Sequence, residues 1–277
     1  MYLITGATGN VGSMIVHQMI QKDQKVRAFV RDPSKARAEL GNKVELFSGN
    51  FEDIETFRAA ALGIEGLFLV TTESDSFLEA LPGLLQTAND TGVTNIVALS
   101  ATADADSPAF FLRRHAAIDA IIRHYTPHAT ILHPDWFMQN FLAWMTSRNM
   151  VFPAGRGKTS FVDVHDVAEI AITCLKDARH AGYLYRPTGP EAMSFENVAS
   201  RISQTLGRSF LYHDISPTVF AEQLQATGME KWRADMQAEM TFALRAGVIS
   251  PPTNDVMFVL GREPRSLDDF LSSNTEA

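Results

Sequence analysis

Residues 2–12 read Tyr2-Leu3-Ile4-Thr5-Gly6-Ala7-Thr8-Gly9-Asn10-Val11-Gly12 and decide the fold. They predict a strand that runs into a glycine-rich turn and then into a helix. Glycines three residues apart allow a tight turn, close approach of the backbone to a pyrophosphate and close packing of helix on strand. The helix would offer its free N–H groups and its positive dipole end to the anion. Glycines that serve packing alone are the alternative. The predicted dinucleotide contacts are Gly6, Ala7, Thr8, Gly9, Asn10 and Val11.

Apolar segments recur along the first 132 residues and alternate with segments of helical periodicity. Continuous apolar strands separated by helices are typical of a doubly wound parallel sheet with right-handed crossovers. The predicted fold class is therefore α/β and Rossmann-like. The predicted strands cover 2–4, 26–30, 44–47, 67–70, 96–99 and 129–132. The predicted helices cover 11–22, 33–40, 54–62, 77–91, 110–125 and 136–147.

The pattern changes after residue 147 and becomes mostly helical. We expect a dinucleotide-binding domain over 1–187, in which 148–160 contributes to a second lobe, and a substrate-covering lobe over 188–277. Such a lobe would close a pocket at the carboxyl ends of the strands, where ligands bind in open α/β sheets. The predicted elements are a hairpin-like glycine-rich segment at 154–158, a strand at 183–186 that rejoins the sheet, and helices at 164–175, 195–206, 217–226, 231–245 and 267–271.

Composition narrows the class of protein. The 277 residues are 45% hydrophobic and 20% charged, as in globular proteins. A formal net charge of −8 argues against nucleic-acid binding, because neutralising phosphates needs clustered Lys and Arg. No apolar run approaches the roughly 20 residues that span a bilayer, and the chain opens on a strand without room for a signal peptide. The only cysteine, Cys174, cannot form an internal disulfide, so we expect a cytoplasmic protein without a membrane partner.

The residue after the second strand of a dinucleotide-binding unit reads the adenosine ribose, and an acidic side chain there selects NAD. Here that residue is Arg31, with Lys35 four positions later. Their cationic groups suit the 2′-phosphate of NADP, so NADPH is the favoured cofactor and NAD the alternative. Asp32 would favour NAD if it faced the ribose, but it can instead cap the helix that Pro33 begins. Topology alone adds four cofactor contacts, Asn50, Phe51, Thr71 and Thr72.

These features resemble the NmrA-like branch of atypical short-chain dehydrogenase/reductase proteins over nearly the whole chain. That branch includes NAD(P)H:quinone oxidoreductases, triphenylmethane-dye reductases and redox-sensing regulators. The resemblance implies that the glycine turn and the basic residue after the second strand bind NADP. It also implies that the segment from Asp135 to Asn140, with Phe137, lines the nicotinamide side. The resemblance is carried by the segments 5–12, 30–35, 134–142, 161–168 and 188–191.

The chain lacks the Tyr-x-x-x-Lys pair of conventional short-chain dehydrogenases, whose phenol donates a proton to a developing alkoxide. Phe111 and His115 stand at the equivalent positions. His115 is the candidate catalytic acid or nicotinamide-ribose ligand, oriented by an i,i+4 contact with Asp119, and a histidine on the surface is the alternative. Ser100, at the end of the fifth strand, either belongs to the site or only satisfies the backbone. Without a phenol, simple ketones are poor acceptors, because the alkoxide they form needs a proton.

Quinones, imines and cationic dyes are better acceptors, since hydride gives them a delocalised anion or a neutral product. They need an apolar pocket, and Trp136 and Phe141 are the candidate substrate residues, although core packing would explain either. No metal site is predicted, because His124, His128 and His133 lack a ligand pattern.

Two functions remain. The first is an NAD(P)H-dependent oxidoreductase that transfers hydride to a small-molecule acceptor such as a quinone, imine or dye. The alternative is a non-catalytic NADP-binding redox sensor that acts through a protein partner. A nucleotide-sugar epimerase is less favoured, because that chemistry depends on the missing tyrosine.

Overall fold

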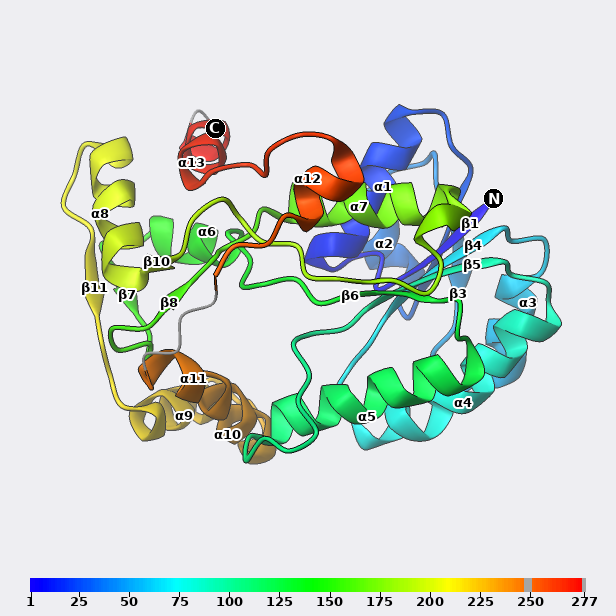
Figure 1. Ribbon diagram of the computed structural model, residues 1–277, viewed down its shortest axis with the longest axis horizontal. Helices are drawn as coiled ribbons and strands as arrows, with labels where there is room; N and C mark the ends of the chain where they lie inside the picture. The colour runs from blue at the N-terminus through cyan, green and yellow to red at the C-terminus, as the bar shows by residue number, and fades with distance from the viewer. Residues whose placement is uncertain (247–250, 276–277) are drawn as a thin grey trace.

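A seven-stranded parallel sheet forms the centre of the computed structural model, which describes residues 1–246 and 251–275 (Figure 1). Its strand order, β3-β2-β1-β4-β5-β6-β9, runs outward from β1 in both directions and confirms the predicted doubly wound fold. The strand predicted near residue 184 rejoins the sheet as β9. The bounds are β1 (Tyr2–Thr5), β2 (Val26–Val30), β3 (Glu45–Ser48), β4 (Gly66–Val70), β5 (Asn95–Leu99), β6 (Thr130–Leu132) and β9 (Leu184–Tyr185).

Helices bury both faces of this sheet. Leu3 and Ile4 alternate between the faces and are both fully buried, which is why the strands read as continuous apolar runs. The core on the Ile4 face is completed by α1 (Asn10–Gln21), α2 (Pro33–Leu40) and α7 (Val164–Lys176). The core on the Leu3 face is completed by α3 (Ile54–Ala61), α4 (Asp75–Asp90) and α5 (Phe110–Tyr125).

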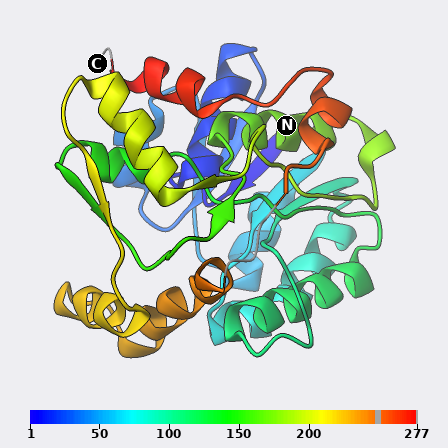
Figure 2. The same ribbon diagram turned by 60° about the vertical axis from the view of Figure 1, so that its left-hand side comes forward.

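A second group of elements, here called the lobe, packs around its own aromatic core (Figure 2). In it, β7 (Asn149–Val151) pairs parallel with β11 (Leu211–His213), and β8 (Lys158–Thr159) pairs antiparallel with β10 (Met193–Ser194). Its helices are α6 (Asn140–Met145), α8 (Phe195–Leu206), α9 (Pro217–Ala226), α10 (Lys231–Met240) and α11 (Phe242–Arg245). Helix α10 packs against α5, which joins the lobe to the sheet.

The remaining elements are divided between the sheet side and the lobe. They are a short 3-10 helix (Ala178–His180), α12 (Asp255–Leu260) and α13 (Leu267–Thr275). Val256 of α12 packs with α7 in the core on the Ile4 face, whereas α13 contacts α8 of the lobe. The domain boundary after residue 187 stays a prediction. Within the described residues, no helix is both long and apolar enough to cross a membrane.

Two predicted helices are wrong in extent. The helix expected over 136–147 is only α6, because Phe137 forms a parallel bridge with Val162 and so holds the preceding residues extended. The helix expected over 231–245 is interrupted at Thr241, where α10 ends.

The glycine-rich segment at 154–158 is a turn but not a hairpin, because β7 and β8 on either side pair with other strands. Its second glycine, Gly157, lies where two backbone segments approach each other closely. A Cβ on Gly157 would lie 1.9 Å from the carbonyl oxygen of Leu244 in α11, so this position excludes other residues.

Candidate active site

The glycine turn after β1 has the geometry of a phosphate-binding cradle. Gly6 has a φ of +58°, and a Cβ there would lie 2.6 Å from the Val70 side chain. A Cβ on Gly12 would lie 2.2 Å from the carbonyl oxygen of Gly6. Helix α1 begins at Asn10 with Gly9 as its N-cap, which supplies no side-chain cap, and its first turn carries no acidic residue. The first N–H groups of α1 are therefore available to an anion.

At the carboxyl end of β2, the structure separates the roles of Asp32 and Arg31. The Asp32 Oδ1 atom accepts hydrogen bonds from the backbone N–H groups of Ser34 and Lys35, at 2.9 and 3.0 Å, and so caps α2. Arg31 is exposed and, in the described part of the chain, makes no hydrogen bond or ion pair. Lys35 is exposed too, with Glu39 at 3.8 Å. The geometry leaves the Arg31 charge available to a ligand.

The other four cofactor candidates lie after β3 and β4. Thr71 is buried, and its hydroxyl donates to the carbonyl oxygen of Leu99 at 2.8 Å. The Asn50 side-chain oxygen accepts from the N–H groups two and three residues later and closes a turn. Phe51 packs on neighbouring phenylalanine rings, and the Thr72 hydroxyl lies 3.2 Å from a serine hydroxyl. Thr71 is the one of the four that lines the cavity described next.

A cavity of about 670 Å³, here called the His115 cavity, lies between the carboxyl end of the sheet and the lobe. Ser100 and His115 line it from the sheet side, and Lys158, Glu239 and Phe242 line it from the lobe. Its position agrees with the expectation that ligands bind beyond the carboxyl ends of the strands.

Five polar side chains, three of them buried and two partly buried, form a network that reaches the wall of this cavity. The Ser100 Oγ atom donates to Asp119 Oδ1 at 2.8 Å and lies 3.0 Å from His115 Nδ1. His133 Nε2 lies 2.7 Å from Asp119 Oδ2, and His115 Nε2 lies 3.4 Å from Glu73 Oε1. His115 is only 3% exposed, so the surface alternative is wrong. Asp119 reaches it through the Ser100 hydroxyl, not by the direct contact that the helix spacing predicted.

This connectivity fixes where His115 carries protons. Because Ser100 gives its proton to Asp119, its oxygen accepts from His115 Nδ1–H. The other ring nitrogen faces the Glu73 carboxylate, and two acceptors in contact need a proton between them. Burial raises the pKa of Glu73, but the hydrogen bond and the charge of His115 lower it, and the net pKa lies below its ordinary value. Each ring nitrogen of His115 therefore lies within reach of an acceptor oxygen, Nδ1 of Ser100 and Nε2 of Glu73.

The loop after β6 places the predicted nicotinamide-side residues. Asp135 Oδ1 accepts from the Trp136 N–H at 2.8 Å and from the Thr159 hydroxyl, and Arg186 lies 3.3 Å from its other oxygen. Asp135, Trp136 and Phe137 all line the His115 cavity. Phe141 does not line that cavity; it is 1% exposed in the lobe core and lines a separate cavity of the lobe.

Sequence reasoning missed Glu73 and gave Ser100 little weight. Glu73 follows β4 by three residues, and Ser100 directly follows the neighbouring β5. Adjacent parallel strands end at the same edge of the sheet. The position of both residues just after such strands was therefore the signal that could have placed them near His115.

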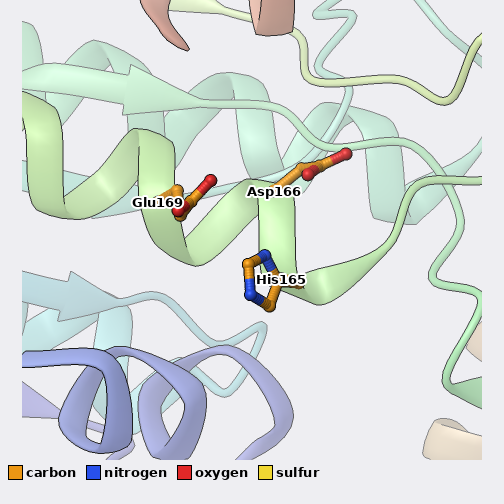
Figure 3. A group of neighbouring side chains, drawn as sticks. All are labelled: His165, Asp166 and Glu169. Atoms are coloured by element: carbon orange, nitrogen blue, oxygen red, sulfur yellow. The ribbon is translucent and has the colours of Figure 1, made fainter. Parts of the chain in front are cut away.

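A separate cluster on α7 has the residue types of a metal site but a different role. His165, Asp166 and Glu169 lie together at the start of α7, with ligand atoms within 4.8 Å of one another (Figure 3). Asp166 Oδ1 binds the Arg262 guanidinium at 2.7 Å, and Glu169 binds the same group. Because this guanidinium already compensates both carboxylates, we assign the cluster to anchoring the segment between α12 and α13.

Comparison with known proteins gives a family and relatives of full length. The model of the NmrA-like family matches residues 2–271. NAD(P)H azoreductase from Xenophilus azovorans is 27% identical, over 100% of this chain and 99% of that protein. Quinone oxidoreductase 2 from Escherichia coli is 24% identical, over 98% of both. The solved structure of Citrobacter sp. triphenylmethane reductase complexed with NADP(H) has a TM-score of 0.83 at 21% identity, over 99% of both chains.

Proposed function

This chain belongs to the NmrA-like family, and we propose that it is an NADPH-dependent oxidoreductase that reduces a quinone, imine or dye. The observation that carries the proposal is the buried His115 network, which opens on a cavity at the carboxyl edge of a dinucleotide-binding sheet. A sensor that only binds nucleotide does not need a proton donor in such a cavity. The names of the azoreductase and the quinone oxidoreductase among the relatives support the same class of acceptor.

The residues of the glycine turn fit a dinucleotide. Gly6 and Gly12 leave no room for a Cβ, and the uncapped start of α1 offers N–H groups to a pyrophosphate. Arg31 is the residue that would pair with a 2′-phosphate, which favours NADPH over NADH. Thr71 and the loop from Asp135 to Phe137 would line the nicotinamide end. When bound, NADPH supplies the hydride.

The protein's own contribution is a proton held at a defined atom. Reduction of a quinone by hydride leaves a hydroquinone monoanion, whose oxygen takes one proton. His115 lines the cavity, and its Nε2 atom, which lies beside Glu73, would donate that proton, after which the ring stays bound to Ser100 through Nδ1. Glu73 stabilises the charged ring before transfer and orients it toward the cavity. A cationic dye becomes neutral on accepting hydride and needs no proton.

We also propose a small-molecule acceptor as the partner and a cytoplasmic location. The location is supported by Cys174, which is buried as a free thiol, because proteins of a reducing compartment keep their thiols unpaired.

The test is turnover. Purified protein is mixed with NADPH and a panel of quinones, imines and cationic dyes, and the loss of reduced-nicotinamide absorbance is followed, with NADPH binding measured separately by calorimetry. We expect NADPH oxidation that depends on the acceptor. Tight NADPH binding without turnover of any acceptor would contradict the proposal and favour the redox sensor.

A further inference from the structure

A second cavity adjoins the His115 cavity on the lobe side. It has a volume of about 700 Å³, and we call it the aromatic cavity. Trp136, Phe137 and Asn140 are the described residues that line both cavities. The two spaces therefore lie on either side of one short segment, at the junction between β6 and α6.

The walls of the aromatic cavity are rings held in fixed orientations. Trp136 meets Phe152 edge to face at a centroid distance of 5.4 Å, and Phe152 stacks on Phe195 at 4.9 Å. Phe220 of α9 meets Phe152 edge to face at 5.3 Å. Ring edges and faces arranged in this way are suited to a further planar ring, which gains offset or edge-to-face contacts beyond the burial of its area.

The two cavities differ in the charge of the side chains that line them. The His115 cavity is lined by ionisable side chains, among them Glu73, Lys158 and Glu239. By contrast, the described residues that line the aromatic cavity include no Asp, Glu, Lys, Arg or His, and their polar side-chain groups are amides, one hydroxyl and the indole N–H groups of two tryptophans. A charged group placed there would lose water without gaining a counter-ion, whereas a neutral ring would not.

Resting on the proposed function, we propose that the aromatic cavity is a second subsite, which binds a neutral aryl arm of an acceptor whose reducible ring lies in the His115 cavity. The favoured substrates are then two-ring acceptors with a short link between the rings. Acceptors with a charged second ring are disfavoured. A small one-ring acceptor uses the His115 cavity alone.

The kinetic test compares three 1,4-benzoquinones: the unsubstituted compound, the phenyl compound and the 4-sulfophenyl compound. Each rate is corrected for the reaction of the quinone with NADPH in the absence of protein. We expect the phenyl compound to have a KM at least about tenfold below those of the other two, since a well-packed ring contributes roughly 1.5 kcal/mol or more. Equal KM values for the three quinones would overturn the inference and leave the proposed function intact.

Ala143 gives a variant that fills the subsite. It is exposed on α6 and lines the aromatic cavity, so Ala143→Trp places an indole there without displacing a packed side chain. We expect Ala143→Trp to remove the advantage of the phenyl compound and to change the KM for unsubstituted benzoquinone by less than about twofold. Leu142→Trp is the matched control, because Leu142 is also exposed on α6 but lines neither cavity. A loss of the phenyl advantage in both variants would contradict the assignment of the subsite.

A binding measurement separates this inference from the proposed function. Phenylhydroquinone and hydroquinone are titrated by calorimetry into the wild-type protein and Ala143→Trp, each in the presence of NADP⁺. Tighter binding of phenylhydroquinone that Ala143→Trp abolishes would support the subsite even if no quinone were turned over. Equal binding of the two hydroquinones to the wild type would overturn it.

Discussion

Arg31 stands where a single side chain would select the cofactor. The structure leaves its charge without a described partner, because Asp32 is occupied in capping α2. An unpaired guanidinium at the end of β2 costs little in water, and it becomes a strong contact when a phosphate arrives.

Replacing Arg31 tests this role directly. In Arg31→Ala, we expect the KM for NADPH to rise about 10- to 100-fold, because one charge-assisted contact to phosphate is lost. The KM for NADH should change less than about twofold, because NADH has no 2′-phosphate. Steady-state kinetics with both nucleotides give the comparison. Lys25→Ala is the control for net charge, since Lys25 is exposed before β2 at the opposite end of that strand. Equal losses for NADPH and NADH would contradict a contact with the 2′-phosphate.

His115 is tested by the difference between two acceptors. In His115→Gln, quinone turnover should fall about 100-fold, because the hydroquinone anion loses its proton donor. Reduction of a cationic triarylmethane dye needs no proton and should change less than about threefold, which also reports that the fold is retained. Turnover of both acceptors is followed through NADPH absorbance. His124→Gln, on the exposed side of α5, is the control. Equal losses with quinone and dye would assign His115 to structure.

The sequence predicts single residues well where local geometry decides their role. The glycine turn and the Asp32 cap depend on neighbours within a few positions, so spacing alone locates them. Glu73 and Ser100 follow β4 and β5, His115 lies in α5, and the three meet only after the sheet forms. A helical spacing rule pointed instead to a direct contact between His115 and Asp119, because it cannot include a hydroxyl from another strand.

At the scale of elements, the types of the predicted helices and strands followed from periodicity, but the limits of two helices did not, and the short strands of the lobe and helix α12 were not predicted. The strands of the sheet lie within one or two residues of their predicted bounds, because burial on both faces gives the inner strands continuous apolar runs. Residues 136–139 have helical composition, yet Phe137 bridges Val162 and the next two residues form a turn, so the helix begins only at Asn140. Tertiary pairing of this kind overrides local propensity.

The ion pairs of α7 with the segment after α12 lead to a prediction about the stability of the protein. Asp166 is fully buried and binds Arg262 and the Arg265 N–H. In Arg262→Met, we expect the free energy of unfolding to fall by about 2 kcal/mol near neutral pH, below the value for a fully buried pair because Arg262 is partly exposed. Urea unfolding followed by circular dichroism measures it. Arg179→Met breaks the exposed pair with Asp177 and should cause no measurable change.

The same variant carries a pH dependence. Burial raises the pKa of Asp166 above its ordinary value, although its bonds to Arg265 and Arg262 lower it in part. When a carboxyl has a higher pKa in the folded state than in the unfolded state, the folded protein loses stability as the pH rises through that folded-state pKa. Removing Arg262 raises the pKa further, so the deficit of Arg262→Met should be small near pH 4 and grow toward about pH 7. A deficit that is constant over this range would show that the charge of Asp166 is not the cause.

At the scale of the whole molecule, the active site is an interface between two separately packed bodies of structure. The sheet and its helices provide the nucleotide turn and the His115 network, while the lobe closes the His115 cavity and forms the aromatic one. The sequence indicated a covering lobe from its change in pattern. It could not show which residues of the lobe meet the sheet, because such contacts form only in the folded chain; Glu239 and Phe110, for example, are 129 positions apart.

One such contact lies at the rim of the His115 cavity. Glu239 of α10 accepts a hydrogen bond from the backbone N–H of Phe110 at 2.9 Å, and this carboxylate caps a helix whose own N-cap, Ala109, has no side chain that can do so. Glu239 also lines the cavity. The contact therefore links the position of the lobe to the site.

Removing this cap should loosen the lobe without touching the nucleotide turn. In Glu239→Ala, we expect the KM for the quinone to rise about fivefold and the KM for NADPH to stay unchanged. The fivefold rise corresponds to roughly 1 kcal/mol, the contribution of one hydrogen bond. Hydrogen–deuterium exchange should become faster in α10 and in the first turn of α5. Glu239→Gln keeps an acceptor oxygen and should restore most of the wild-type behaviour. Unchanged exchange in Glu239→Ala, or an equal rise in the KM for NADPH, would show that this contact does not hold the lobe over the cavity.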